Sequence, residues 1–139
     1  NPQETAKVFA DGWLKTGDIA RIDEEGFLFV LDRKKDMLIR GGENIYCIEV
    51  ENALFDHPDI VDAAVVGIPH RTLGEEPGAV VTLKPGARVS EQDIRAFVAE
   101  RLAAFKVPVR VVARDEALPR NPNGKILKNV LKTLFQDEQ

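Results

Sequence analysis

Ile60-Val61-Asp62-Ala63-Ala64-Val65-Val66-Gly67-Ile68 is an apolar run rich in β-branched residues. That composition is typical of a buried strand. Two later runs have the same character, at residues 79–83 and 109–112. The first of these ends at Lys84-Pro85-Gly86, a turn-forming sequence. We therefore expect three strands at the centre of the fold.

Helical patterns surround these strands. One is predicted before His57-Pro58 by apolar residues at helical spacing, Cys47, Val50 and Leu54. Ser90 is a predicted N-cap, with Asp93 in the capping-box position. The apolar stripe of the helix that it begins is Ile94, Phe97, Val98, Leu102 and Phe105. A last helix is marked by Ile126, Leu127, Val130, Leu131, Leu134 and Phe135.

The amino-terminal part has a different pattern. Two β-prone runs, 18–23 and 27–31, flank Glu24-Glu25-Gly26 and predict a hairpin. Asp32-Arg33-Lys34-Lys35-Asp36 then breaks the apolar pattern and is the best candidate for a linker. The predicted fold class is α+β: a small three-stranded sheet flanked by helices, preceded by a β-hairpin.

Composition excludes several classes of function. Of the 139 residues, 44% are hydrophobic and 30% charged, enough for a real core. The net charge of -4 argues against nucleic acid as the main partner, and no apolar run approaches the roughly 20 residues of a membrane span. The single Cys47 cannot form an internal disulfide, and neither histidine has metal-ligand spacing with it. We expect no metal site and a reducing cytoplasm.

Four polar stretches could carry chemistry, although each has an ordinary structural explanation. Residues 12–18 could be a turn before a strand, and residues 33–36 a solvated charge run. Residues 40–44 form a glycine-rich turn, which usually only permits positive φ. Residues 119–125 predict a stiff, exposed loop whose Lys125 could simply be solvated.

The combination is more specific than its parts. It consists of Trp13-Leu14-Lys15-Thr16-Gly17-Asp18, Asp32-Arg33-Lys34-Lys35-Asp36-Met37, Gly41-Gly42-Glu43-Asn44-Ile45-Tyr46 with Glu49-Val50-Glu51, and Asn123-Gly124-Lys125. In this order and spacing it resembles the adenylate-forming superfamily of acyl-CoA synthetases, luciferases and peptide-synthetase adenylation domains. The glycine-rich segment is most similar to the medium- and long-chain acyl-CoA synthetases of fatty acid metabolism.

The resemblance implies a ligase that works in two steps. ATP, with Mg, and a carboxylate give an acyl-adenylate and pyrophosphate, and the acyl group then passes to the thiol of CoA. By position, Asp18 matches the acid that accepts hydrogen bonds from the ribose hydroxyls. Arg33 matches the nucleotide-contacting arginine, whose donors suit ribose and phosphate oxygens. Lys35 matches the hinge on which the small domain rotates between the steps.

Three more residues take roles from the resemblance. Gly41 and Gly42 match the loop that lines the tunnel for the pantetheine arm of CoA. Lys125 matches the catalytic lysine of adenylation, whose ammonium neutralises charge as carboxylate and α-phosphate join. Cys47 stands where many relatives have proline, and Asp32 where many have glycine; neither position is expected to do chemistry.

The resemblance also predicts the domain organisation. Residues 1–32 correspond to the tail of a large amino-terminal AMP-binding domain, and residues 33–139 to the mobile carboxy-terminal domain. The main partner of this chain is then the large amino-terminal domain of the same enzyme, and the chain by itself is expected to be inactive. Two alternatives stay open: a non-catalytic binding module, and an adenylating enzyme with a different acyl acceptor.

Overall fold

The computed structural model describes residues 1–136, so the last three residues of the predicted second domain, 137–139, lie outside the described residues. The chain divides into two compact units, Asn1–Asp36 and Met37–Gln139.

The first unit contains one short helix and two small antiparallel sheets. Its elements are α1 (Pro2–Val8), β1 (Phe9–Ala10), β2 (Trp13–Leu14), β3 (Asp18–Ile22) and β4 (Leu28–Arg33). The predicted hairpin is confirmed, because β3 pairs with β4 in antiparallel register. Its loop is closed by Asp23, whose Oδ1 accepts hydrogen bonds from the backbone N–H groups of Glu25 and Phe27. The sequence did not predict α1, β1 or β2, which are too short to show a period.

The first unit has little core of its own. Within the described residues, every hydrophobic side chain that is fully buried lies in the second unit. Trp13 is 80% exposed, and large apolar side chains of the β3–β4 hairpin are also open to solvent, among them Ile22, Phe27, Leu28 and Val30. Two small sheets of this kind cannot bury enough apolar surface for independent stability.

The second unit is built on a five-stranded sheet. Its strands are β5 (Leu38–Arg40), β6 (Glu43–Ile45), β7 (Ile60–His70), β8 (Gly74–Leu83) and β9 (Arg110–Arg114). The order is β6-β5-β8-β7, and β9 lies parallel to β8. The three predicted strands are present as β7, β8 and β9, but the expected strand number was too low. The added strands β5 and β6 have three residues each, too few to show alternation.

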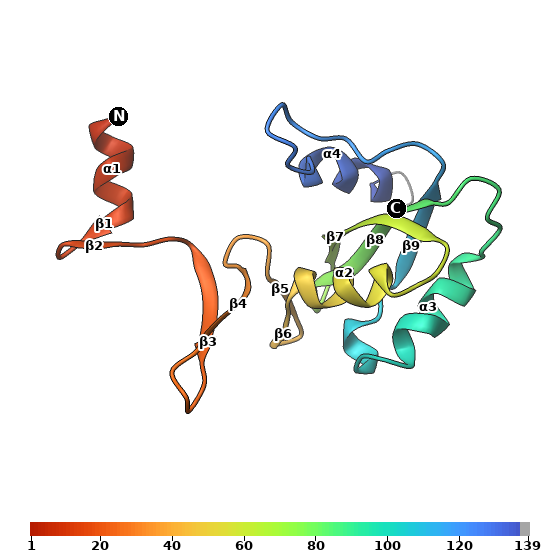
Figure 1. Ribbon diagram of the computed structural model, residues 1–139, viewed down its shortest axis with the longest axis horizontal. Helices are drawn as coiled ribbons and strands as arrows, with labels where there is room; N and C mark the ends of the chain where they lie inside the picture. Colours follow the sequence, from red (N-terminus) through yellow and green to blue (C-terminus); the bar gives the residue numbers. More distant parts are fainter. Residues whose placement is uncertain (137–139) are drawn as a thin grey trace. The chain divides into compact units, whose positions relative to one another are not determined.

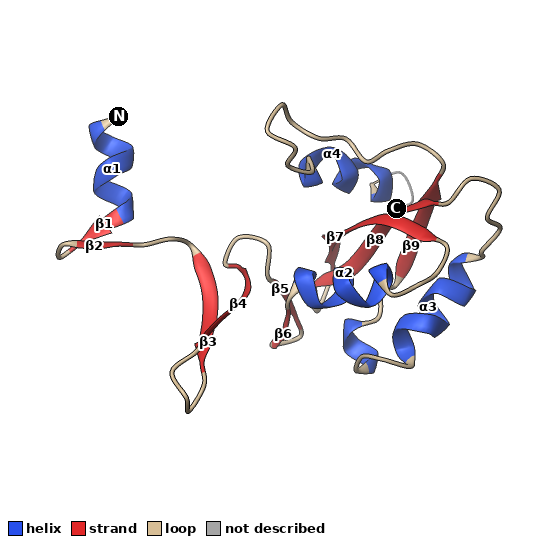
Figure 2. Ribbon diagram, viewed as in Figure 1, coloured by secondary structure: helices blue, strands red, loops and turns tan. Residues whose placement is uncertain are grey.

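Helices cover both faces of this sheet, as Figures 1 and 2 show. One face carries α2 (Cys47–Phe55) and α3 (Glu91–Ala99), and the other carries α4 (Lys128–Lys132). Alternate strand residues point to the two faces. Val65 and Val81 therefore belong to one core cluster, and Val66 and Val80 to the other. The α+β class is confirmed.

The helices agree in part with their predicted extents. The capping box of α3 is confirmed, since Ser90 Oγ accepts a hydrogen bond from Asp93 N at 3.1 Å. The predicted stripe, however, leaves the helix after Ala99: Leu102 and Phe105 pack on the core from the following turn and a 3-10 helix, η1 (Ala104–Lys106).

The last helix starts later than its apolar pattern suggests. Ile126 forms a β-bridge with Arg120, which keeps residue 126 out of the helix, so that α4 begins at Lys128. The final turn is another 3-10 helix, η2 (Thr133–Phe135). Among residues 1–136, no helix combines the length and apolar character that crossing a bilayer requires.

Candidate functional site

Asp18 and Arg33 lie opposite each other on the hairpin of the first unit. Asp18 begins β3, Arg33 ends β4, and the register pairs them directly. Arg33 Nε lies 3.0 Å from Asp18 Oδ1. Because the Arg33 side chain is 56% exposed, this ion pair contributes at most about 1 kcal/mol to stability. The fold thus brings the two predicted nucleotide-binding residues together in a weak, accessible pair.

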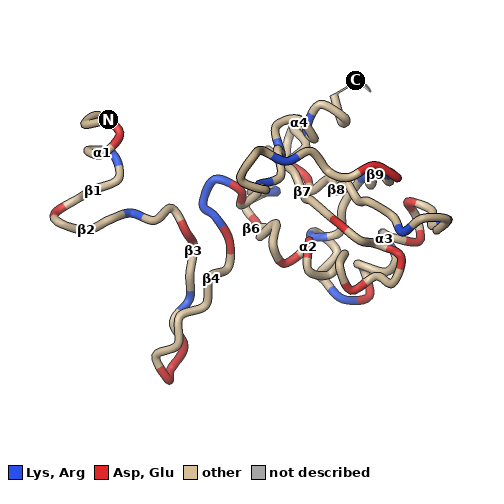
Figure 3. Tube along the Cα trace, turned by 45° about the horizontal axis from the view of Figure 1, so that its top comes forward, with Lys and Arg blue, Asp and Glu red and all other residues tan. Residues whose placement is uncertain are grey.

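Lys35 lies in an exposed turn at the end of the first unit. The turn follows β4 and is closed by a hydrogen bond from Asp36 N to Arg33 O at 3.0 Å. The division between the units falls directly after Asp36. Figure 3 shows the basic residues that follow β4 in this segment. The position suits a hinge, which stays a prediction.

Gly41 and Gly42 form the two-residue turn between β5 and β6, where Arg40 pairs with Glu43. Their φ angles are +56° and +89°, and two consecutive positive values define a turn that strongly favours glycine. The Gly41 N–H donates to Leu73 O at 2.8 Å. Both glycines are exposed, so their backbone is accessible to a ligand.

Lys125 extends from a loop that Asn121 organises. Asn121 Oδ1 accepts hydrogen bonds from the backbone N–H groups of Asn123 at 3.0 Å and Lys125 at 2.9 Å. Backbone bonds from Asn121 N to Lys125 O at 2.8 Å and from Gly124 N to Asn121 O at 2.9 Å complete the turn. Lys125 is exposed. The lysine is therefore carried by an ordered backbone although it lies at the surface.

This loop is also tied to the sheet. The Arg120 guanidinium donates to Gly124 O at 2.8 Å and to Asp62 Oδ2 at 2.6 Å. Asp62 lies near the start of β7. Arg120 therefore clamps the lysine loop to the beginning of this strand.

The lysine loop and the glycine turn are anchored at opposite ends of β7. Asp62 holds the first, and the second contacts the turn that follows His70. From 62 to 70 the strand advances eight positions, on the order of 25 Å if fully extended. That distance is far beyond the reach of a lysine side chain. Lys125 and the glycine pair thus belong to different surfaces of the same unit.

The Glu49-Val50-Glu51 motif has a structural role. Glu49 Oε2 lies 2.7 Å from Lys106 Nζ. Glu51 Oε1 accepts a hydrogen bond from Val65 N at 2.9 Å and lies 2.8 Å from Lys128 Nζ. Strand β7 is at the edge of the sheet. By accepting the hydrogen bond of the Val65 N–H, Glu51 satisfies a backbone donor that another strand could otherwise pair with.

Sequence reasoning missed several of these supporting residues. Asn121 carries a recognisable signal, because asparagine before Pro-Asn-Gly is typical of an Asx turn. Arg120 and Asp62 carry none, since nothing local connects residues so far apart in the chain. Within residues 1–136, no group of three or more His, Cys, Asp or Glu side chains is arranged to hold a metal ion.

The fold matches that of the carboxy-terminal domain of adenylate-forming enzymes. The family model described as AMP-binding enzyme C-terminal domain matches residues 49–125, and the chain belongs to this family. The predicted resemblance is thereby confirmed at the level of the family. The roles assigned to single residues stay predictions.

The comparisons with individual proteins agree. The chain is similar to the 2-succinylbenzoate–CoA ligase of Geobacillus kaustophilus, with 50% identity over 134 residues, covering 96% of this chain and 27% of that protein. It is 43% identical to the fatty acid–[acyl-carrier-protein] ligase ScoC of Streptomyces coeruleorubidus, over 96% of this chain and 26% of the relative.

Among solved structures, ATP-bound MatB from Rhodopseudomonas palustris matches with a TM-score of 0.86 and 40% identity, over 98% of this chain and 27% of that one. The chain thus spans about a quarter of the length of the relatives that it matches.

Proposed function

We propose that the chain is the carboxy-terminal part of an ATP-dependent carboxylate–CoA ligase. Such an enzyme would join a carboxylate to ATP, with Mg, as an acyl-adenylate, and would then transfer the acyl group to CoA. The observation that carries the proposal is the separation of Lys125 from the Gly41-Gly42 turn along β7. If one small domain serves both chemical steps in turn, it needs one surface for each step, and the Lys125 loop and the glycine turn lie on two different surfaces.

Adenylation would use the Lys125 surface. An exposed ammonium on an ordered loop can approach a carboxylate and an α-phosphate that another domain holds, and it neutralises the charge that develops as they join. Lysine stays charged at neutral pH without help from neighbours. The clamp by Arg120 and Asn121 supports this role, because a catalytic charge is effective only if it is held in place.

Nucleotide binding would use the hairpin of the first unit. The Asp18 carboxylate offers acceptors for two adjacent ribose hydroxyls, and the Arg33 guanidinium offers donors to ribose or phosphate oxygens. Their mutual ion pair is exposed and weak, so exchanging it for a nucleotide costs little. Residues 1–32 would then belong to the large AMP-binding domain, which supplies the remaining nucleotide contacts.

Thioester formation would use the glycine turn. Without side chains, Gly41 and Gly42 leave room for the narrow pantetheine arm beside the backbone. Residues 33–139 would rotate between the two steps, with Lys35 as the hinge, because an exposed turn can absorb large φ and ψ changes without disturbing packed side chains. A cytoplasmic location fits this chemistry, since ATP and CoA are available there.

The large domain would be the chain's principal partner. The exposed apolar side chains of the first unit support this, because a surface of that kind is normally covered. The chain alone would be inactive, since the acyl pocket and the phosphate-binding loop are expected in that domain.

A different acyl acceptor is the second candidate function. The relative ScoC is named a fatty acid–[acyl-carrier-protein] ligase, so a carrier-protein thiol could replace CoA in this chain's reaction. The glycine turn would serve either acceptor, because both present a pantetheine arm. A purely non-catalytic binding module has no need of a lysine on a clamped loop.

The test uses the full-length enzyme that carries this chain. It is incubated with ATP, Mg, a panel of carboxylic acids of different length, and either CoA or a carrier protein bearing pantetheine. Mass spectrometry should find AMP and acyl-CoA in equal amounts. Acyl-carrier protein without acyl-CoA would select the second candidate, and absence of AMP with every acid would contradict a ligase of either kind.

A further inference from the structure

The turn between β7 and β8 supports the glycine turn. Strand β5 pairs with β8 at Arg40 and Gly74, and Gly41 N donates to Leu73 O at 2.8 Å. A Cβ added to Gly41 would lie 3.1 Å from Leu73 Cδ2. The glycine turn therefore rests directly on Leu73.

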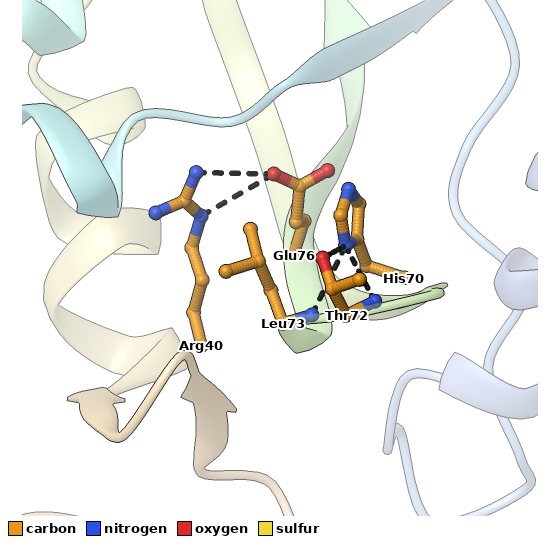
Figure 4. Close-up of polar contacts among 5 residues, drawn as sticks. All are labelled: Arg40, His70, Thr72, Leu73 and Glu76. Carbon is orange, nitrogen blue, oxygen red and sulfur yellow. Dashed lines mark hydrogen bonds and ion pairs between the residues drawn. The ribbon is translucent and has the colours of Figure 1, made fainter.

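His70 holds this supporting turn in shape. Its Nδ1 accepts hydrogen bonds from Thr72 N at 3.2 Å and Leu73 N at 3.1 Å, as Figure 4 shows. Thr72 Oγ1 lies 3.5 Å from the same nitrogen. An imidazole nitrogen accepts only when it carries no proton, so the arrangement requires Nδ1 to be unprotonated. Leu73 is then held on both sides, through its N–H by His70 and through its carbonyl by Gly41.

A second brace lies on the other side of Leu73. Arg40 donates to Glu76 Oε1 from Nε at 3.3 Å and from Nη2 at 3.1 Å. This ion pair fixes the end of β5 on β8 but does not reach the Gly41 peptide. The Gly41 peptide is held by Leu73, whose own N–H is held by His70.

We propose that His70 is a positioning residue for the CoA step. It acts through Leu73, setting the Gly41 peptide in the conformation that admits the pantetheine arm, and it touches neither CoA nor the adenylate. This inference rests on the proposed function of the glycine turn. The required chemical feature is an acceptor at the δ position of residue 70, which asparagine also offers through Oδ1.

The structural half of the test uses the chain itself. Hydrogen exchange of the Gly41 amide is followed by NMR in wild type, His70→Ala and His70→Asn. His70→Ala should speed Gly41 exchange by about 10-fold, in line with the loss of one or two modest hydrogen bonds, and His70→Asn should stay near wild type. His57→Ala is the control, because His57 Nδ1 also accepts from a backbone N–H, that of Asp59 at 3.1 Å, before β7 begins. It should leave Gly41 unchanged.

The functional half uses the full-length enzyme. His70→Ala should raise the KM for CoA by about 5- to 10-fold, the effect of losing one or two modest hydrogen bonds, and His70→Asn should restore it. ATP–pyrophosphate exchange should stay near wild type in both variants, which a merely destabilised domain would not achieve.

Two results would overturn the inference. The first is an unchanged Gly41 exchange rate in His70→Ala, which would mean that His70 does not hold the Gly41 peptide through Leu73. The second is faster Gly41 exchange with an unchanged KM for CoA, while bulky residues at Gly42 still impair the CoA step. The proposed function would fail separately, if bulky residues at Gly42 impaired adenylation and thioester formation equally.

Discussion

Gly42→Leu tests the glycine turn without a collision inside the domain. Gly42 has a φ of +89°, and a Cβ added there would meet no atom within 4 Å. The substitution therefore costs backbone strain, about 1–2 kcal/mol of the free energy of unfolding. In the full-length enzyme, the new side chain would project where the pantetheine arm is proposed to pass.

The expected effect is selective for the second step. Displacing a reacting group by about 1 Å can reduce a rate on the order of 100-fold, so thioester formation from supplied acyl-adenylate should fall to that extent. Adenylation should stay close to wild type. Gly41→Leu should show the same selectivity with a larger loss of stability, because its Cβ would lie 3.1 Å from Leu73 Cδ2.

Gly86 provides a matched control. Its φ is +78°, and a Cβ there also meets nothing within 4 Å, so Gly86→Leu should lose a similar stability. Gly86 follows the end of β8, whereas the glycine turn pairs near Gly74 at its start. The assays are pyrophosphate exchange, CoA-dependent turnover of supplied adenylate, and thermal melting. Equal loss of both steps in Gly42→Leu, or the same CoA defect in Gly86→Leu, would refute a tunnel role.

Three further predictions concern the hinge, the chain alone and the sheet edge. Lys35→Pro should restrict φ in the turn after β4 and impair thioester formation more than adenylation if the enzyme is held in its first pose; unchanged rates of both steps would remove Lys35 from the hinge. The purified chain should show no substrate-dependent ATP–pyrophosphate exchange; appreciable exchange would contradict the proposal that the acyl pocket and the phosphate-binding loop lie in another domain. Glu51→Ala should lower the free energy of unfolding by about 1–3 kcal/mol, because it removes the carboxylate that accepts the Val65 N–H bond and pairs with Lys128; a denaturation midpoint equal to wild type would show that Glu51 is dispensable.

The central strands and the capping box could be predicted because their signals are local. The run from Ile60 is long and β-branched, and Ser90 with Asp93 is a pattern of a single turn. Strands β5 and β6 could not be predicted, since three residues on each side of a glycine pair show no period. They join the sheet through the pairing of Arg40 in β5 with Gly74 in β8, more than thirty residues away in the chain.

The residues of the candidate site also divide into those that could be predicted from the sequence and those that could not. The motif residues Asp18, Arg33, Gly41 and Lys125 stand out by resemblance, and the hairpin register explains why the first two meet. Supporting residues such as Arg120, in a loop, and His70, at the end of β7, do not stand out, because a polar side chain at such a position is usually solvated. Their roles depend on long-range contacts or on which ring nitrogen accepts a hydrogen bond, and neither is visible in the sequence.

The most direct measurement of the central claim is a separate assay of the two half-reactions in full-length Lys125→Ala. Lys125 is exposed, so the substitution should change stability by no more than about 0.5 kcal/mol. Adenylation should fall on the order of 100-fold or more, as expected when one stabilising charge is lost. Supplied acyl-adenylate and CoA should still give thioester at a rate near wild type, because the glycine turn lies on another surface. Unimpaired adenylation, or loss of both steps with an unchanged melting curve, would contradict the division of labour between the two ends of β7.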